Sequence, residues 1–192
     1  MDFSGRKSAG LFRGMPTIRQ CAFRLRDSPV GIGHRALIGG AEGFGHVLEK
    51  GIRWEVIWFD FDQGLIEILF ACSNGYFSGT CQIYLSRDEL SELANALNGF
   101  PSSARDSRKV ELGTFDPKYA DGGIRINLYC SDSRGHSIAE IQLRGDGCKA
   151  LGEVESVALR IPIEPAGLDS FLAQVVAAGT EIGSTAFLPM AT

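Results

Sequence analysis

The chain has 192 residues, 44% of them hydrophobic and 22% charged, so it is long enough to bury a hydrophobic core of its own. Its net charge of −4 and its pI near 5.4 argue against a nucleic-acid-binding protein, which usually presents a basic face. No apolar run approaches the roughly 20 residues of a membrane-spanning helix, and no signal-peptide pattern follows the N-terminus. We therefore expect a cytoplasmic protein that binds neither nucleic acid nor a membrane.

The first 50 residues are rich in glycine and weakly patterned. One possible strand covers residues 17–26, where Cys21, Phe23 and Leu25 alternate with polar or small residues. The glycines between residues 31 and 45 do not continue into the Gly-Lys-Ser/Thr of a phosphate-binding loop, so a connector is the simpler interpretation. Met15 is an alternative start, in which case the preceding residues form an extension.

Residues 51–180 are predicted to form a single α+β domain. A strand over residues 53–61 carries both tryptophans, Trp54 and Trp58, and a hairpin follows over residues 65–85. Asn74-Gly75 favours a two-residue type I′ turn, in which Ser73 pairs with Tyr76. The side chains expected on the core face in this register are Ile66, Ile68, Phe70, Cys72, Phe77, Gly79, Cys81 and Ile83.

A helix is predicted over residues 87–98. Ser86 and Glu89 have the spacing of a capping box, in which each side chain accepts a hydrogen bond from the backbone amide of the other residue. The apolar stripe recurs at helical spacing, and Gly99 ends the helix. The stripe consists of Leu90, Leu93, Ala94 and Leu97.

The second half contains another hairpin, a further strand and a second helix. After a polar loop over residues 101–109, strands at 124–130 and 138–144 place Leu128, Ala139 and Ile141 on one face. A strand over 154–163 precedes a helix over 166–178, which Pro165 begins and Gly179 ends. Residues 181–192 are expected to be a tail.

The fold class is therefore predicted to be α+β. Six to eight strands joined by hairpins would form a mainly antiparallel sheet, and the two helices would pack on one face of it.

The outer face of the first hairpin is the candidate binding surface. Tyrosine with small hydroxyl side chains is a composition favoured at protein interfaces, although it also occurs on a solvated sheet face. The candidate residues are Tyr76, Ser78, Thr80, Gln82 and Tyr84. The second hairpin presents a mixed-charge face with the same two interpretations.

Catalytic and metal motifs are weak. Asp60 and Asp62 could act as a general acid and base or bind a divalent ion, but Asp-x-Asp-x-Gly is also ordinary turn chemistry. A zinc site using His34 and His46 with these aspartates fits no known ligand spacing, and His136 lies at a turn, away from the core-facing Cys130. The five cysteines, an odd number without a C-x-x-C pair, are expected to be buried free thiols. We expect no cofactor, no metal site and no catalytic residue.

The order of the elements resembles small bacterial families of unknown function that are similar to the WapI-type immunity proteins. The matching features are Ile66-Glu67-Ile68-Leu69-Phe70, Gly75-Tyr76-Phe77-Ser78-Gly79, the acidic helix from Asp88 to Leu97, Gly135-His136 and Ile163-Glu164-Pro165. The resemblance covers about residues 53–176. It implies a non-enzymatic α+β domain that binds a cognate toxin, and it transfers no catalytic residue.

Three functions follow from these features. A protein-binding domain is favoured because the scaffold is well specified and no catalytic set is present, and the resemblance implies an immunity protein. A structural or self-associating domain would use the same sheet face in a symmetric dimer. A small metal-dependent enzyme would use Asp60 and Asp62.

Overall fold

The computed structural model describes residues 49–116, 122–145 and 154–192. The possible strand at residues 17–26, Met15, Cys21, His34, His46 and Cys148 lie outside this part of the chain. The described elements are β1 (Gly51–Asp60), β2 (Leu65–Ser73), β3 (Ser78–Ser86), α1 (Arg87–Leu97), β4 (Ser107–Gly113), β5 (Gly123–Cys130), β6 (Ser137–Arg144), β7 (Ser156–Ile163), α2 (Pro165–Ala178) and β8 (Thr185–Pro189).

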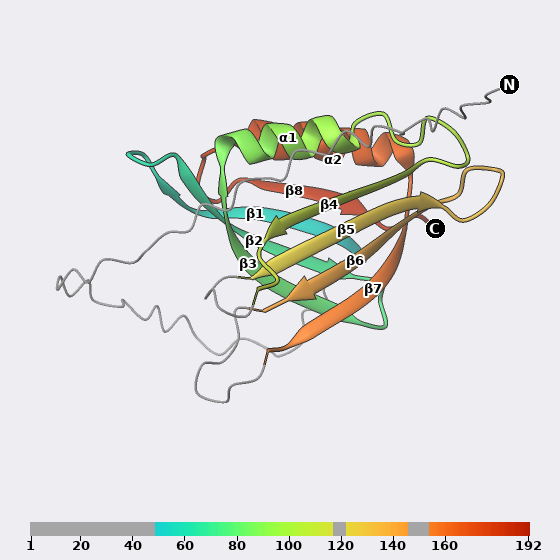
Figure 1. The fold of residues 1–192 in the computed structure, drawn as a ribbon, viewed down its shortest axis with the longest axis horizontal. Helices are drawn as coiled ribbons and strands as arrows, with labels where there is room; N and C mark the ends of the chain where they lie inside the picture. Colours follow the sequence, from blue (N-terminus) through green and yellow to red (C-terminus); the bar gives the residue numbers. More distant parts are fainter. Residues whose placement is uncertain (1–48, 117–121, 146–153) are drawn as a thin grey trace, which may run out of the picture. The chain divides into compact units, whose positions relative to one another are not determined.

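These strands form two four-stranded antiparallel sheets. Sheet A has the order β3-β2-β1-β8, and sheet B has the order β4-β5-β6-β7. Figure 1 shows α1 and α2 together along one border of the strands, on the side of β8 and β4. The α+β class with antiparallel pairing is confirmed, but the strands divide between two sheets instead of forming one sheet with both helices on a single face.

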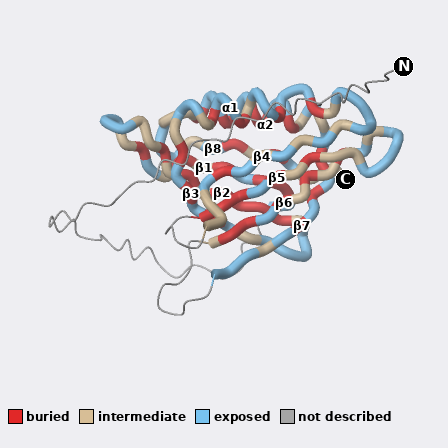
Figure 2. Tube along the Cα trace, viewed as in Figure 1, coloured by how far each residue is buried: buried red, intermediate tan, exposed pale blue. Residues whose placement is uncertain are grey.

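The core lies between the two sheets and beneath the helices. Burial mostly alternates along the strands and places apolar residues on the inner faces, as Figure 2 shows, although the end of β2, from Phe70 to Ser73, is buried continuously. β3 contacts all four strands of sheet B, which means that it crosses that sheet instead of following one strand. The helices add Leu90, Leu93, Leu97, Leu168, Phe171, Leu172 and Val175 to the same core.

The turn of the first hairpin is larger than predicted. Ser73 pairs with Ser78, so the loop comprises residues 74–77 and Phe77 is 68% exposed, contrary to its predicted place in the core. Only Gly75 has a positive φ, whereas a type I′ turn needs two positive values. The Asn74 Oδ1 atom instead accepts hydrogen bonds from the amides of Tyr76 and Phe77, at 3.0 and 2.9 Å, and this Asx turn sets the loop.

Compared with the predicted register, each β2 residue pairs with a β3 residue two positions further along the chain. A shift of two positions leaves every side chain on its predicted face of the sheet. Ile66, Ile68, Phe70 and Cys72 on β2 are buried, and so are Cys81 and Ile83 on β3. Cys72 lies opposite Gly79 and Cys81 opposite Phe70, instead of the predicted Phe77 and Ile68. The described cysteines, Cys72, Cys81 and Cys130, are free thiols, of which Cys130 is only half-buried.

The predicted tail is wrong, because Thr185–Pro189 forms β8 at the border of sheet A. It pairs antiparallel with β1, where Ile52 lies opposite Leu188 and Trp54 opposite Ala186. Leu188 and Ala186 are buried in the core, and burial of these apolar side chains stabilises this short strand. The segment is therefore part of the domain.

The signals predicted at the helix ends are present. Ser86 caps α1 and forms the full capping box with Glu89. Pro165 occupies the first turn of α2, and Gly99 and Gly179 follow the two helices with positive φ. Neither helix in the described part of the chain is long and apolar enough to cross a bilayer.

Candidate functional site

The predicted binding residues lie mostly where the sequence placed them. Ser78, Thr80, Gln82 and Tyr84 are exposed along β3, on the outer face of sheet A. Tyr76 lies in the turn beyond the strand and is 91% exposed. The structure therefore brings four of the five candidates into one row and leaves Tyr76 outside it.

The neighbouring strands extend this row into a wider face. Glu67, Leu69 and Ala71 of β2 lie opposite Tyr84, Gln82 and Thr80, and β1 continues the same rows. We define the outer face of sheet A as Ser78, Thr80, Gln82 and Tyr84 on β3, Leu65, Glu67, Leu69 and Ala71 on β2, Arg53, Glu55 and Trp58 on β1, and Thr185 and Phe187 on β8.

A β-bulge brings Trp58 onto this face. Trp54 and Val56 point into the core, and simple alternation would bury Trp58 as well. Between Val56 and Trp58, however, the register shifts by one residue, so Trp58 pairs with Glu67 on the outer face and Phe59 is buried in its place. Trp58 was not predicted as a site residue, because the alternation of apolar and polar residues along a strand does not reveal a bulge.

The segment before β8 holds the bulge. The amide of Gly183 donates to the carbonyl oxygen of Val56 at 2.8 Å, and the amide of Val56 donates to the carbonyl oxygen of Ser184 at 3.0 Å. Both backbone groups of Val56 are therefore bonded to the residues between α2 and β8. The position of Trp58 depends on that distant part of the sequence.

Trp58 and Tyr84 form an aromatic pair across β2. Their ring centroids are 6.3 Å apart and their planes are inclined at 85°, an edge-to-face arrangement. Each residue is 42% exposed. Glu67 lies between them in the register, since it pairs with Trp58 on one side and with Tyr84 on the other.

Glu67 differs from the other glutamates of the sheets. Glu55 lies 3.7 Å from Arg53, Glu111 lies 2.6 Å from Arg125, and Glu140 lies 2.9 Å from Arg160. Glu67 has no ion pair with any residue in the described ranges. The Glu67 carboxylate on the outer face of sheet A therefore has Trp58 and Tyr84 as its cross-strand neighbours, whereas the other three glutamates each have an arginine nearby.

Several charged side chains on the outer face of sheet B pair with one another. Asn127 and Arg160 both donate hydrogen bonds to Glu140, at 3.3 and 3.0 Å, and these bonds lower the pKa of Glu140. The guanidinium of Arg125 bonds to Glu111 and lies 3.8 Å from the centre of the Phe115 ring. This mixed-charge surface has the character of a solvated sheet face.

Asp60 forms a turn. Its Oδ1 atom accepts hydrogen bonds from the amides of Asp62 and Gln63 at 2.8 and 3.2 Å, and Gly64 completes the reversal with a φ of +65°. Among residues 49–116, 122–145 and 154–192, no group of three or more histidine, cysteine, aspartate and glutamate side chains is arranged to hold a metal ion. The geometry favours the turn interpretation of Asp60 and Asp62.

His136 and Cys130 have separate partners. The Nδ1 atom of His136 lies 2.5 Å from Asp132 Oδ2, and this contact is the main cause of a lowered pKa at Asp132. The Cys130 thiol donates to the carbonyl oxygen of Ser103 at 3.7 Å. Burial raises the pKa of the Cys72 thiol to about 12, so Cys72 is a poor nucleophile.

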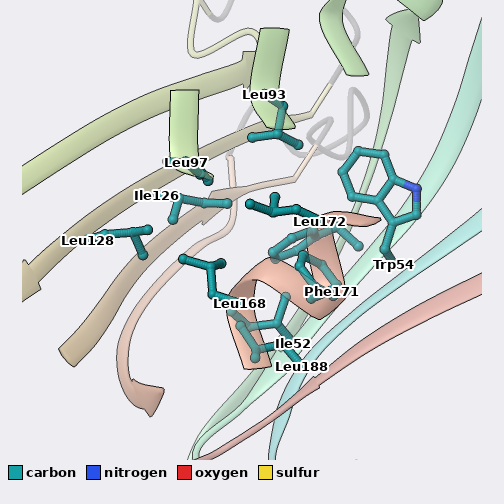
Figure 3. A pocket seen from close by; sticks show the side chains of 11 residues that line it. Ile52, Trp54, Leu93, Leu97, Ile126, Leu128, Leu168, Phe171, Leu172 and Leu188 are labelled. Carbon is teal, nitrogen blue, oxygen red and sulfur yellow. The ribbon is translucent and has the colours of Figure 1, made fainter. Parts of the chain in front are cut away.

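A cavity between the sheets and helices of the described domain is too small for a ligand. It has a volume of about 10 Å³, and Figure 3 shows side chains of both sheets and both helices converging on it. The lining is entirely apolar, from Ile52 and Trp54 on β1 to Phe171 and Leu172 on α2. A space of this size barely admits one water molecule.

Comparison with known proteins gives no match to a family model, to a curated protein or to a solved structure. The resemblance to WapI-type immunity proteins stays a prediction.

Proposed function

We propose that this chain is a non-enzymatic protein-binding domain whose contact surface is the outer face of sheet A. The single observation that carries the proposal is the Trp58–Tyr84 pair, in which two large aromatic side chains lie together and exposed on a rigid sheet. Tryptophan and tyrosine are enriched at protein interfaces, where they bury a large area at a small cost in conformational entropy.

The surroundings of this pair support the proposal. Leu65, Leu69 and Phe187 are half-buried on the same face. Ser78, Thr80 and Gln82 give it a polar border on β3. Aromatic side chains at the centre and polar side chains at the rim are common in protein interfaces.

A bacterial toxin is the kind of partner that the resemblance to immunity proteins favours, and we place the interaction in the cytoplasm. The net charge of −4 favours a basic partner, because opposite charges accelerate association. A toxin encoded beside this chain is the first partner to test.

Site-specific photo-crosslinking in the native cell tests the proposal. A photoreactive amino acid at Thr80, on the outer face of sheet A, is compared with one at Gln142, on the outer face of sheet B. We expect one defined protein to crosslink from position 80 only. The same protein, once purified, should bind the chain and lose affinity in the Trp58→Ala and Tyr84→Ala variants. Crosslinking from position 142 alone, or binding that both substitutions leave intact, would reject the proposal.

Self-association through the same face is the second candidate. β3 is an edge strand of sheet A, and its sequence, SGTCQIYLS, contains neither a charged residue nor a proline. Charged residues and prolines normally protect an edge strand from pairing with another chain. Light scattering of the purified chain over a range of concentrations separates a dimer from a monomer, and crosslinking from position 80 to a second copy would support the dimer.

A further inference from the structure

Resting on the proposed function, we infer that Trp58, Glu67 and Tyr84 form a binding site for one cationic side chain, a lysine or arginine of the partner protein. We call these three residues the Trp58–Glu67–Tyr84 row. They lie side by side on three neighbouring strands of sheet A, in a single cross-strand register.

The two aromatic rings suit a cation by their geometry. Because their planes are inclined at 85° and their centroids are 6.3 Å apart, the rings form two walls of a corner. A lysine or arginine within about 6 Å of a ring centroid is attracted by the negative face of the ring. Both residues are paired with Glu67 within sheet A, Trp58 directly after the bulge of β1, so the corner exists before a partner arrives.

The charge of the row points to the same occupant. Glu67 is half-buried, has no ion pair within the described ranges, and has an aromatic residue on each side. The arginines nearby in the fold are engaged, since Arg53 pairs with Glu55, and Arg87 lies over the Phe59 ring and bonds to Thr180. A cation from a partner would supply the pairing that Glu55, Glu111 and Glu140 obtain within the chain.

Other occupants fit this row less well. An anionic group would be repelled by the Glu67 carboxylate. An apolar side chain would stack on the rings but would cover the carboxylate without pairing it, which costs free energy. The combination of two rings and one carboxylate therefore selects a basic side chain.

Nuclear magnetic resonance of the full chain tests the inference. The probe is a short end-capped peptide with three arginines, and the matched control peptide has glutamates in their place. The indole N–H signal of Trp58 is the readout, and that of the buried Trp54 is the internal reference. We expect the arginine peptide to shift the Trp58 signal saturably, with no shift of Trp54 and no effect of the glutamate peptide.

The Glu67→Gln variant supplies the decisive comparison, and Glu111→Gln on sheet B is its matched control. Loss of the carboxylate should weaken binding of the arginine peptide about fivefold or more, and Glu111→Gln should leave it unchanged. Glu67 is half-buried and Glu111 is exposed, and an unchanged melting temperature will show that both variants fold. Equal binding by Glu67→Gln, or an equal shift by the glutamate peptide, would overturn the inference.

The partner experiment separates this inference from the proposed function. If a purified partner binds through sheet A with unchanged affinity for Glu67→Gln, the cation site is rejected and the protein-binding function stands. If the partner contacts only sheet B or the helices, both are rejected.

Discussion

Gly79 of β3 lies directly against Val157 of β7, so close that a Cβ atom at position 79 would come within 2.4 Å of Val157 Cγ1. Gly79 does not have a positive φ, so its backbone conformation does not require glycine. The requirement comes from the close approach of the two sheets. This contact fixes part of the path of β3 across sheet B.

We predict that Gly79→Ala lowers the free energy of unfolding by about 1–3 kcal/mol, because the added methyl group overpacks the space between the sheets. Val157→Ala should relieve this contact. The double variant should therefore be more stable than the sum of the two single effects implies, by about 0.5–3 kcal/mol. Urea denaturation of all four proteins measures the coupling, and strictly additive effects would mean that the two side chains do not meet.

The capping box of α1 gives a second prediction. The amide of Ser86 donates to Glu89 Oε2 at 2.7 Å, and the amide of Glu89 donates to Ser86 Oγ at 3.4 Å. Ser86→Ala should lower the free energy of unfolding by about 1 kcal/mol, since it leaves an amide of the first turn without a partner. Ser91→Ala, at an exposed position of the same helix, is the control and should change stability by no more than a few tenths of a kcal/mol.

The local features of the fold could be predicted from the sequence. The capping box, the stripe of α1 and the glycine after each helix depend on residues close together in the chain, and all are present. The faces of β2 and β3 were also predicted, because alternation is unchanged by a shift of two residues. The predicted loop length was wrong because the Asn74 side chain accepts hydrogen bonds from the amides of Tyr76 and Phe77, which forms an Asx turn and a four-residue loop.

The missing features depend on contacts between distant residues. β8 has only five residues and forms because β1, more than 120 positions away, offers it a partner and a core. The bulge before Trp58 likewise depends on distant residues, because Gly183 and Ser184 form hydrogen bonds with the backbone of Val56. The candidate site was therefore predicted along β3, and its aromatic half on β1 was not.

The loop after α1 gives a prediction about acid stability. Arg108 donates to the carbonyl oxygens of Ala96, Asn98 and Gly99 and to the carboxylate of Asp106. The bond from Arg108 is the main cause that lowers the pKa of Asp106 to about 2. Because this pKa is lower in the folded state, the ionised Asp106 stabilises the fold above about pH 4, and that contribution is lost as the pH falls toward about 2.

Asp106→Asn should therefore be less stable than the natural chain at neutral pH. The difference between the two proteins should shrink as the pH falls from about 4 to about 2, since protonation removes the same charge from Asp106. Chemical denaturation at several pH values measures it. A difference that stays constant over this range would show that Asp106 acts without its charge.

The last prediction concerns the exposure of the aromatic pair and needs no partner. Trp54 is 1% exposed and Trp58 is 42% exposed, so quenching by acrylamide should report mainly on Trp58. Tyr84→Ala removes the ring that covers one side of Trp58, so quenching should increase and the emission should move to longer wavelength. Trp58→Phe leaves only the buried Trp54 and should be nearly insensitive to acrylamide. Tyr76→Ala, in the turn outside the row, is the matched control and should not alter quenching. If Tyr76→Ala exposed Trp58 as much as Tyr84→Ala does, the cross-strand pairing of Trp58 and Tyr84 would be incorrect, and the proposed binding face would lose its centre.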